Sequence, residues 1–311
     1  AIPREVPAEE LARRRDFRDV TTLTIDPVDA KDFDDALSLK KLPNGNWEVG
    51  VHIADVTYYL QPGTVLDEEA RQRATSVYLV DRTIPMLPEV LSNDLCSLRP
   101  NEDRPAFSAV FEMDAQANIK KEWFGRTVIH SDRRFAYHEA QERIETGKGE
   151  FAKEVRTLQA FAEKLRVRRF KAGGIDFNTE EVKFELDKTG KPLRVVIKRM
   201  LEANRLIEDF MLLANVRVSR YLAKPRGGEG KQEEATRTAV YRIHDRPDPE
   251  KLRQLRTFVA KFGLEMPKIN PTNAEAALRQ LLQVAAGTNA ENVVKTMAIR
   301  SMAKAEYSTQ N

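Results

Sequence analysis

Short stretches in which apolar and polar residues alternate dominate the early part of the chain. The β-branched run TTLTID (21–26) predicts a strand, and ALSLKK and WEVGVHI, joined through the turn signal Asn44-Gly45, predict a hairpin. A second strand pair is predicted across residues 106–124, where AFSAVFEM alternates, DAQAN reverses the chain and IKKEWF follows. The early half of the chain therefore predicts a sheet of mixed or antiparallel strands.

Helical periodicity replaces this alternation from residue 138. Residues 138–171 and 200–222 each predict amphipathic helix, and helices dominate again from residue 248. The buried stripe expected for the helix at 200–222 is Leu206, Ile207, Phe210, Met211, Leu213 and Ala214. Before that helix, VKFEL–DKTGK–PLRVVI predicts a third hairpin that turns at Gly190. The expected fold class is α+β: a twisted mixed or antiparallel sheet from the N-terminal half, packed with helices mostly from the C-terminal half.

Two segments follow neither pattern. Residues 1–20 are polar apart from a short helical stretch, PAEELARRR, and are expected to be a linker, so that the domain spans residues 21–311. The segment 224–237 (KPRGGEGKQEEATR) has the composition of an exposed loop. No closing element is predicted for the last residues, AEYSTQN.

Composition narrows the class of protein. With 41% hydrophobic and 32% charged residues, the 311-residue chain has a globular composition, and no apolar run approaches the roughly 18 residues of a membrane span. The single cysteine, Cys96, excludes a disulfide framework, and the N-terminus lacks the apolar core of a signal peptide. A cytoplasmic protein without a membrane partner is expected by default.

Charge adds less. The net charge is +3, and the basic residues are clustered at Arg13–Arg15, Arg133–Arg134 and Arg166–Lys171. Such runs usually form solvated helix faces, and this is the interpretation that we favour for the first of them. A polyanionic partner is compatible with the clusters but is not established by them.

Five aspartates lie within ten residues of the run TIDPVDAKDFDDAL: Asp26, Asp29, Asp32, Asp34 and Asp35. The ordinary interpretation of such a run is an acidic surface loop. Here, however, the run lies directly between two apolar strands, and Ala30, Phe33 and Ala36 provide a packing side. Carboxylates held together repel each other unless a cation or solvent offsets the charge. The run therefore favours a metal site.

Hard oxygen ligands at this density suit Mg²⁺ or Mn²⁺, and the small number of histidines, four, argues against zinc. A calcium-binding hand loop fits poorly, because the glycine expected after D-x-D-x-D is missing. Two metal ions about 4 Å apart could activate a water and stabilise the leaving oxygen of an in-line phosphoryl displacement. The spacing of the aspartates does not by itself identify the reaction.

Aromatic residues outside the predicted core are candidates for stacking on bases, which contributes roughly 1–3 kcal/mol per base. We identify Tyr78, Tyr137 and Phe177 as such candidates, and assign Phe135 to the core. Tyr78 is flanked by turn and proline signals, which makes it a candidate wall of a pocket.

Three polar residues are also considered for the site. Glu208 is either a solvated helix residue or a contact to a nucleotide or a tyrosine. Arg242 could contact a phosphate from its place beside His244. His52 lies in an apolar strand and is more typical of a satisfied core histidine than of a base.

Several motifs now occur together in one order. After TIDPVDAKDFDDAL come VGVHIADVTYYLQPGTVLDEEA, SVYLVDRTIPMLPEVLSNDLCSLRPNEDRPAFS, LEANRLIEDFMLLAN and YRIHDRP. In these motifs the chain resembles the RNB catalytic domain of the ribonuclease II/ribonuclease R family, over nearly its whole length from about residue 20. The bacterial ribonuclease R (VacB-type) branch is the nearer match, through VLSNDLCSLRP and the LIE helix.

The resemblance implies a divalent-metal-dependent, processive 3′→5′ exoribonuclease that hydrolyses single-stranded RNA to 5′-nucleoside monophosphates at the bottom of a narrow channel. It further implies a bacterial cytoplasmic enzyme of RNA degradation, with a monomer expected. Two Mg²⁺ or Mn²⁺ ions are expected when substrate is bound.

The resemblance also implies roles for single residues. The four acidic positions of the family fall on Asp26, Asp32, Asp34 and Asp35, and Asp29 is not among them. Asp34 matches the residue whose loss stops chemistry while RNA binding remains. The RNA-binding positions are Tyr78, which sets the final product length, Phe177 on the other side of the base clamp, and Tyr137 with Glu208 at the terminal nucleotide.

Two departures from the family pattern are visible. Family members carry small nucleic-acid-binding barrels before this domain and an S1 barrel after it, and neither is present in this sequence. A TSPIRRYPD-like segment, whose arginines contact the scissile phosphate, is expected beyond IRSMAKAEYSTQN. The chain is therefore expected to be a catalytic domain truncated at its C-terminal end, with weak or no activity alone.

Two other functions remain open. One is an RNA-binding scaffold of the same fold that does not cleave; such a protein tends to lose the aspartates, all four of which are present here. The other is a metal phosphodiesterase that acts on DNA or on a small nucleotide, because the contacts that distinguish RNA from DNA cannot be located from the sequence.

Overall fold

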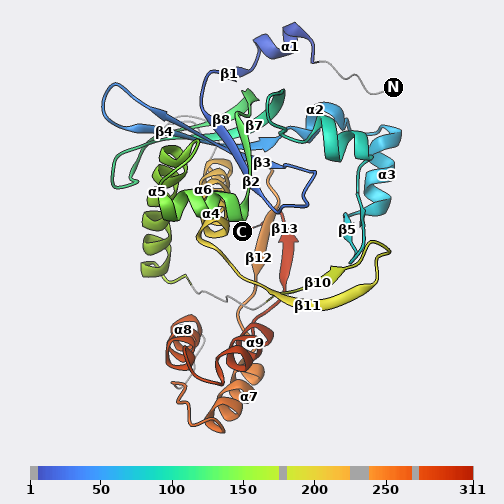
Figure 1. Cartoon of the computed structure of the whole chain (residues 1–311). Helices are drawn as coiled ribbons and strands as arrows, with labels where there is room; N and C mark the ends of the chain where they lie inside the picture. The colour runs from blue at the N-terminus through green and yellow to red at the C-terminus, as the bar shows by residue number, and fades with distance from the viewer. Residues whose placement is uncertain (1–5, 175–180, 225–237, 268–272, 311) are drawn as a thin grey trace, which may run out of the picture. The chain divides into compact units, whose positions relative to one another are not determined.

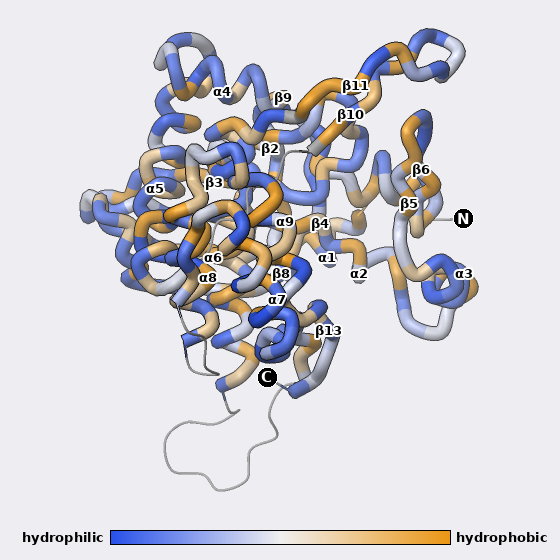
Figure 2. Tube along the Cα trace, turned by 90° about the horizontal axis from the view of Figure 1, so that it is seen from below, coloured by the Kyte–Doolittle hydropathy of each residue, from blue (hydrophilic) through white to orange (hydrophobic). Residues whose placement is uncertain are grey.

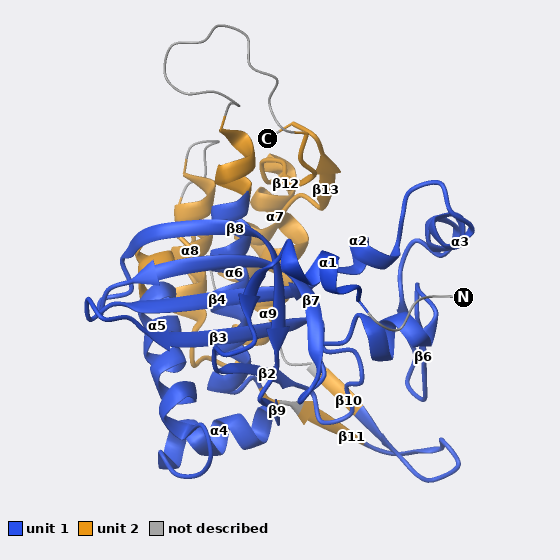
Figure 3. Ribbon diagram, turned by 90° about the horizontal axis from the view of Figure 1, so that it is seen from above, with its two compact units in different colours: residues 1–166, 184–194, 200–218 blue, residues 167–183, 195–199, 219–311 orange. Residues whose placement is uncertain are grey.

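The computed structural model describes residues 6–174, 181–224, 238–267 and 273–310 (Figure 1). The aromatic candidate Phe177 and nearly all of the predicted loop 224–237 lie outside these ranges. The chain divides into two compact units, which are coloured separately in Figure 3. Unit 1 comprises residues 1–166, 184–194 and 200–218, and unit 2 comprises residues 167–183, 195–199 and 219–311.

Unit 1 is built on a seven-stranded sheet with the strand order β1-β8-β7-β4-β3-β2-β9. Its strands are β1 (Arg15–Phe17), β2 (Thr22–Asp26), β3 (Asp35–Lys41), β4 (Trp47–Ala54), β7 (Asp103–Met113), β8 (Ile119–His130) and β9 (Arg133–Ala136). The central pairs are antiparallel, whereas β1–β8 and β2–β9 are parallel, so the predicted mixed sheet is confirmed.

Both predicted hairpins of this sheet are present. β3 and β4 pair around Gly45, whose φ of +84° places it in the left-handed region that glycine adopts without strain. β7 and β8 pair around the DAQAN turn, in which the carboxylate of Asp114 accepts from the backbone N–H groups of Gln116 and Asn118.

Three helices cover one face of the sheet (Figure 1): α4 (Tyr137–Thr146), α5 (Ala152–Lys171) and α6 (Glu202–Ala223). The core between sheet and helices contains large side chains from both layers, with Phe111 and Phe135 fully buried in the sheet and Phe210 fully buried on α6. The predicted α+β class is thus confirmed. The helices that pack on the sheet were expected mostly from the C-terminal half, but they come from the middle of the chain. The helices after residue 248 bury their apolar faces against one another instead.

Shorter segments cover the opposite face of the sheet. They are the helices α2 (Val56–Tyr59) and α3 (Val65–Arg73), the π-helical turn η1 (Leu91–Leu95) and the residues that follow it. A polar chain runs across the strands under this cover. The imidazole of His52 lies between the hydroxyls of Ser108 (Nδ1–Oγ 2.6 Å) and Ser38 (Nε2–Oγ 2.8 Å). His52 is fully buried, and a Cβ at Gly50 would lie 2.4 Å from its Nε2 atom, so the close packing requires glycine there.

The stretch before residue 20, expected to be a linker, contributes to this unit. Its helix α1 (Ala8–Ala12) leads into β1, which pairs with β8. Arg14 was expected on a solvated face but is buried, and its guanidinium donates to the carboxylate of Asp55 (2.8 Å) and to the backbone carbonyls of Ala106 and Thr127. Because the buried Asp55 carboxylate needs a counter-charge, the arginine is drawn into the protein.

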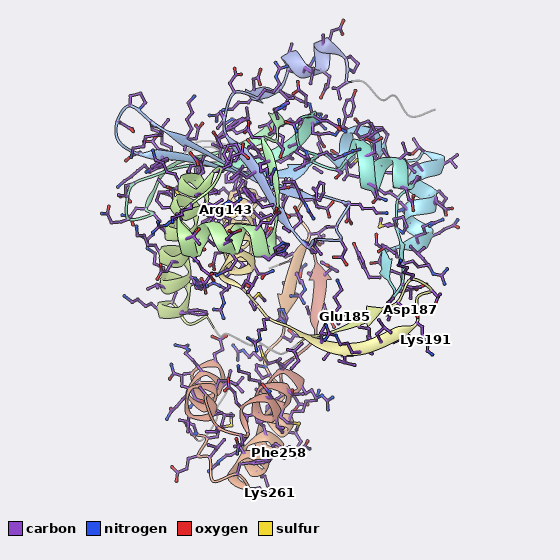
Figure 4. All side chains as sticks on the ribbon, viewed as in Figure 1. Arg143, Glu185, Asp187, Lys191, Phe258 and Lys261 are labelled. Atoms are coloured by element: carbon purple, nitrogen blue, oxygen red, sulfur yellow. The ribbon has the colours of Figure 1, made fainter. Side chains whose placement is uncertain are left out.

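Unit 2 has its own core. The helices α7 (Pro249–Ala260), α8 (Ala274–Ala285) and α9 (Glu291–Ser301) pack their leucines and alanines against one another. The ring of Phe258 on α7 (labelled in Figure 4) lies 5.2 Å from the ring of Phe262, which follows the end of the helix. The segment predicted to lack a closing element forms β13 (Ala305–Ser308), which pairs antiparallel with β12 (Tyr241–His244). None of the helices in the described ranges combines the length and apolarity needed to cross a bilayer.

The third predicted hairpin is also present, as β10 (Glu181–Leu186) and β11 (Pro192–Lys198). At its turn the carboxylate of Asp187 accepts from the backbone N–H groups of Thr189 and Lys191 (Figure 4). Apolar residues such as Val182, Leu193 and Val195 alternate with polar ones along the hairpin, and their side chains are exposed. The apolar residues give both strands orange segments in Figure 2. Residues of this hairpin belong to both units. One short hairpin remains, formed by β5 (Val77–Tyr78) and β6 (Thr83–Ile84).

Candidate active site

Strand pairing brings one end each of β2, β3 and β9 together. Asp26 is the last residue of β2 and Asp35 is the first of β3, and the antiparallel register, with Leu23 opposite Leu37, places both at the same edge. Residues 27–34, the aspartate loop, connect the two strands and carry Asp32 and Asp34. On its other side β2 pairs with β9, so that Asp26 lies beside Ala136, and Tyr137 follows as the first residue of α4.

Backbone contacts to Ser97 and its neighbours hold the second half of the aspartate loop. The buried hydroxyl of Ser97 accepts from the N–H of Phe33 (3.0 Å) and donates to the carbonyl of Lys31 (2.9 Å). The N–H of Leu98 donates to the carbonyl of Phe33 (2.8 Å), and that of Ala54 donates to the carbonyl of Asp34 (2.9 Å). These hydrogen bonds fix the backbone before and after Asp32, and at Asp34 itself.

Arg134 holds the first half of the loop. From β9 its guanidinium donates to the backbone carbonyls of Pro27 (2.5 Å) and Val28 (3.0 Å) and lies over the ring of Phe33, 5.4 Å from its centre. Its positive charge also favours ionisation of Asp26, against the effects of burial. One arginine of the basic pair Arg133–Arg134 therefore has a structural role, because it fixes the aspartate loop.

The aspartates oppose one another's ionisation. Burial, and next the charge of Asp35, raise the pKa of Asp26 to about 7. Burial and the charge of Asp34 raise the pKa of Asp35 to about 6, and partial loss of hydration with the charge of Asp32 raises the pKa of Asp34. Each of the four carboxylates is thus electrostatically coupled to another of the group. The positive charge around them does not fully neutralise their negative charge.

The donor set fits a hard divalent cation in its chemistry and charge. Only oxygen ligands are present, and the buried Oδ2 of Asp26 has no hydrogen-bond partner in the structure. A cation at this edge would relieve the repulsion that raises the pKa values of Asp26, Asp34 and Asp35. As their side chains lie, no three His, Cys, Asp or Glu residues in the described ranges form a ready coordination group. As they lie, the carboxylates could supply only part of the ligands of a metal ion, and water and substrate oxygens would have to supply the others.

Tyr78 lies beside the loop in the β5–β6 hairpin. Its hydroxyl donates to Oδ2 of Asp32 (3.4 Å), and burial together with the charges of Asp32 and Asp34 raises its pKa. Tyr78 is 68% exposed, so most of its surface is open to a ligand. Tyr78, Asp32 and Asp34 line one cleft of roughly 700 Å³, together with Cys96. Burial raises the pKa of the Cys96 thiol to about 12, which keeps it protonated and unreactive.

Tyr137 lies on the other side of the aspartates. Burial, and then the charges of Asp26 and Asp35, raise its pKa to about 12, and the side chain of Asn204, near the start of α6, hydrogen-bonds it. The strand register therefore brings Tyr137 to the carboxylates, although it follows Asp35 by about a hundred residues.

The remaining candidate residues lie on α6, on β12 or outside the described ranges. Glu208 is on the exposed side of α6 in unit 1. Arg242 is in unit 2 on β12, where its guanidinium contacts Nε2 of His244 (3.1 Å), and Nδ1 of the same ring contacts the carbonyl of Ala303 (3.3 Å). Phe177 lies outside the described residues.

Sequence reasoning did not identify Ser97 or Arg134 as part of the site. Ser97 was only one residue of a longer motif, and a serine in an apolar run carries no signal of its own. Arg134 was noted only as half of a basic pair, and its contact with the loop depends on the parallel pairing of β9 with β2.

Comparison with protein families and relatives gives a consistent result. The family model of the RNB domain matches residues 14–311. DIS3-like exonuclease 2 from Schizosaccharomyces pombe is 38% identical over 96% of this chain, and Ribonuclease R from Thermotoga maritima is 38% identical over 100% of this chain. This chain spans 33% and 43%, respectively, of those two proteins.

Solved structures agree with the fold. RNase R from Mycoplasma genitalium, in complex with double-stranded RNA, superposes with a TM-score of 0.86 at 26% identity, over 98% of this chain and 54% of that one. Yeast Ssd1, a pseudonuclease, superposes with a TM-score of 0.74 at 20% identity, over 97% of this chain and 36% of that one, and therefore shares the fold.

Proposed function

This chain belongs to the RNB domain family, and we propose that it carries the carboxylates of a processive 3′→5′ exoribonuclease, which hydrolyses single-stranded RNA to 5′-nucleoside monophosphates. The observation that carries the proposal is the coupled row of Asp26, Asp32, Asp34 and Asp35 beside the cleft of Tyr78. The relatives named Ribonuclease R and DIS3-like exonuclease 2 support the same reaction. Because the chain spans less than half of either, the activity of the whole protein is part of the proposal.

Asp26, Asp32, Asp34 and Asp35 would hold Mg²⁺ or Mn²⁺, two ions with substrate bound, and such ions activate a water and stabilise the leaving oxygen. The carboxylates themselves are the ligands, and Ser97 and Arg134 keep their loop in one conformation. Asp34, which is more exposed than Asp26 and lines the cleft, is the carboxylate proposed to be indispensable for the chemistry.

The aromatic residues would hold the 3′ end of the RNA. The open ring of Tyr78 is proposed to stack on a base near the carboxylates, and Tyr137 to contact the terminal nucleotide from the other side. Phe177, Glu208 and Arg242 are proposed RNA contacts on the strength of the family motifs alone.

We also propose a monomeric protein of the bacterial cytoplasm. The relatives named Ribonuclease R from Lactococcus lactis and Thermotoga maritima, 36% and 38% identical, support a bacterial source. DIS3-like exonuclease 2 proteins from Schizosaccharomyces pombe and Xenopus tropicalis are similar to the same degree, so the bacterial assignment rests on the motifs.

The test uses the complete protein that contains this chain and a 3′-labelled single-stranded RNA with Mg²⁺. We expect labelled mononucleotide as the first product, and no product when EDTA removes the metal. Labelled fragments of many lengths, which indicate internal cuts, would contradict the proposal. A DNA of the same sequence in a parallel reaction distinguishes an exoribonuclease from a general phosphodiesterase.

The alternative function is an RNA-binding scaffold of the same fold. The fold shared with the pseudonuclease Ssd1 supports it, and the presence of all four aspartates speaks against it. In the same experiment a scaffold would bind the RNA and leave it intact in the presence of Mg²⁺.

A further inference from the structure

A second cavity lies in unit 1, at the end of the sheet away from the aspartates. Trp47, the first residue of β4, lies in its wall, whereas Asp35 pairs with Ile53 near the other end of that strand. The intervening length of strand is roughly 20 Å. The cavity measures roughly 520 Å³ and is lined by Trp47, Ala115, Gly147, Lys153, Arg156, Thr157, Ala160, Phe161 and Lys164.

Three cations on one side of α5 give this cavity its charge: Lys153, Arg156 and Lys164. No lining residue is acidic, and no ion pair in the described part of the chain joins any of the three to a carboxylate. Arg166, on the buried side of the same helix, pairs with Glu202 (2.6 Å) and lies 3.6 Å from Asp209. Carboxylates of α6 therefore neutralise the buried cation of α5, whereas the three cavity cations have no carboxylate partner among the described residues.

The cavity is built of fixed parts. The rings of Trp47 and Phe161 meet edge to face at 6.4 Å, and Nζ of Lys41 lies 4.5 Å from the centre of the Trp47 ring, which adds a fourth cation nearby. The guanidinium of Arg156 lies against the backbone of Gly147, where a Cβ would be 2.5 Å from Nη1. Lys164 donates to the carbonyl of Ala115 (2.7 Å).

We propose that this cavity binds the phosphodiester backbone of single-stranded RNA, as a contact separate from the aspartate site. Lys153 and Lys164 are three turns of α5 apart, roughly 16 Å along the axis. One free phosphate cannot bridge that distance, whereas an extended strand can follow it. Unpaired cations beside aromatic rings are the features of a groove that tracks a single strand. The inference rests on RNA being the substrate, as proposed above.

The test measures RNA affinity against salt concentration with the complete protein in EDTA, so that nothing is hydrolysed. Each phosphate contact to a single strand contributes about 0.7 to the slope of log K against log [salt]. Replacing two cations, Lys153→Gln with Arg156→Gln, should lower the slope by about 1.4 and weaken binding roughly 10- to 30-fold at about 0.1 M salt. Hydrolysis of a trinucleotide with Mg²⁺, which is too short to reach from the aspartates to the cavity, should not change.

Two matched variants sharpen the test. Lys120→Gln with Lys121→Gln removes the same charge from cations that already pair with Asp114 and Glu112, and should leave the slope close to that of the wild type. Arg156→Lys keeps the positive charge and should retain the salt slope. It therefore distinguishes the loss of charge from a disturbance of the fold at this position.

An unchanged slope in the Lys153/Arg156 variant, with trinucleotide hydrolysis intact, would overturn the inference alone. Absence of hydrolysis by the wild type would instead overturn the proposed function. Displacement of RNA by millimolar inorganic phosphate from the wild type but not from the variant would show a site for a single anion, and would also refute the inference.

Discussion

At the scale of single residues, the aspartates differ in ways that their spacing does not reveal. The sequence predicted a hard-metal site at strand ends, and the structure places Asp26 and Asp35 there and couples both to Asp34. Asp29 lies exposed in the same loop. What spacing could not predict is the burial of Asp26, because that depends on β9, which lies over a hundred residues later.

The role proposed for Asp34 leads to a direct comparison. Asp34→Asn removes a charged ligand but keeps the size of the side chain, so RNA hydrolysis with Mg²⁺ should fall by roughly 10²- to 10³-fold or more, with RNA affinity in EDTA retained. Asp29→Asn makes the same chemical change at a residue of the same loop that also lines the cleft but is not one of the four proposed ligands, and should leave the rate within about twofold. Hydrolysis by Asp34→Asn at the wild-type rate would refute the assignment.

Ser97 should act on the reaction without contacting the substrate. Ser97→Ala leaves the carbonyl of Lys31 and the N–H of Phe33, both part-buried, without their partner, at a total cost of about 1–3 kcal/mol. We expect hydrolysis to slow roughly tenfold and the Mg²⁺ concentration for half-maximal activity to rise, because the loop that carries Asp32 and Asp34 loosens.

The control is Ser131→Ala, which removes a buried hydroxyl that has no hydrogen-bond partner in the structure. It should change neither the rate nor the Mg²⁺ requirement. A lower rate for Ser97→Ala with an unchanged Mg²⁺ requirement would mean that Ser97 serves the general stability of the fold.

At the scale of elements, a buried ion pair between Arg14 and Asp55 attaches the segment between α1 and β1 to the rest of unit 1. The side chains of Arg14 and Asp55 are almost completely buried, and Arg14 also lies 5.5 Å from the centre of the Tyr58 ring. The sequence could not predict this, because an arginine between Arg13 and Arg15 has the pattern of a solvated helix face. The partner that changes its environment is some forty residues away.

Breaking that pair should destabilise the protein strongly. Arg14→Gln leaves the Asp55 carboxylate buried without its closest cation, so the free energy of unfolding in urea should fall by about 3–5 kcal/mol. Arg13→Gln, at the exposed neighbouring position, should change it by less than about 0.5 kcal/mol. Equal unfolding free energies for the two variants would show that the pair contributes nothing.

The polar chain across β3, β4 and β7 makes stability depend on pH. Burial, helped by the charge of Arg15, lowers the pKa of His52 to about 3, whereas an unfolded histidine has a pKa near 6.5. Below pH about 6.5 the unfolded chain binds a proton that the folded protein does not. The contribution of His52 is therefore fully present above that pH, and is lost by about 1.4 kcal/mol per unit as the pH falls towards 3.

The measurement is the free energy of unfolding in urea at pH values near 6.5 and 4.5, for the wild type and for His52→Gln. The variant starts from a lower stability but should lose about 2–3 kcal/mol less over this range, because it lacks the titrating group. Parallel losses in the two proteins would show that another group titrates.

At the scale of the whole molecule, the sequence predicted the class and the hairpins but not the two outer pairings of the sheet. Hairpins are signalled locally by turn residues such as Asn44-Gly45, whereas the parallel pairs β1–β8 and β2–β9 join strands with no turn between them. The separate core of α7–α9 was also not predicted, because amphipathic periodicity shows that a helix has an apolar face but not what that face packs against.

The parallel pairing of β2 with β9 has a consequence for how the protein folds. The N–H of Thr22 donates to the carboxylate of Asp132, 110 residues away, and closing so long a loop is slow compared with forming the hairpins between. Arg134 and Tyr137 therefore reach the aspartates only after the central strands have assembled. During synthesis, a nascent chain that has not yet reached residue 133 carries all four carboxylates without Arg134 and Tyr137, so the site is completed late in folding.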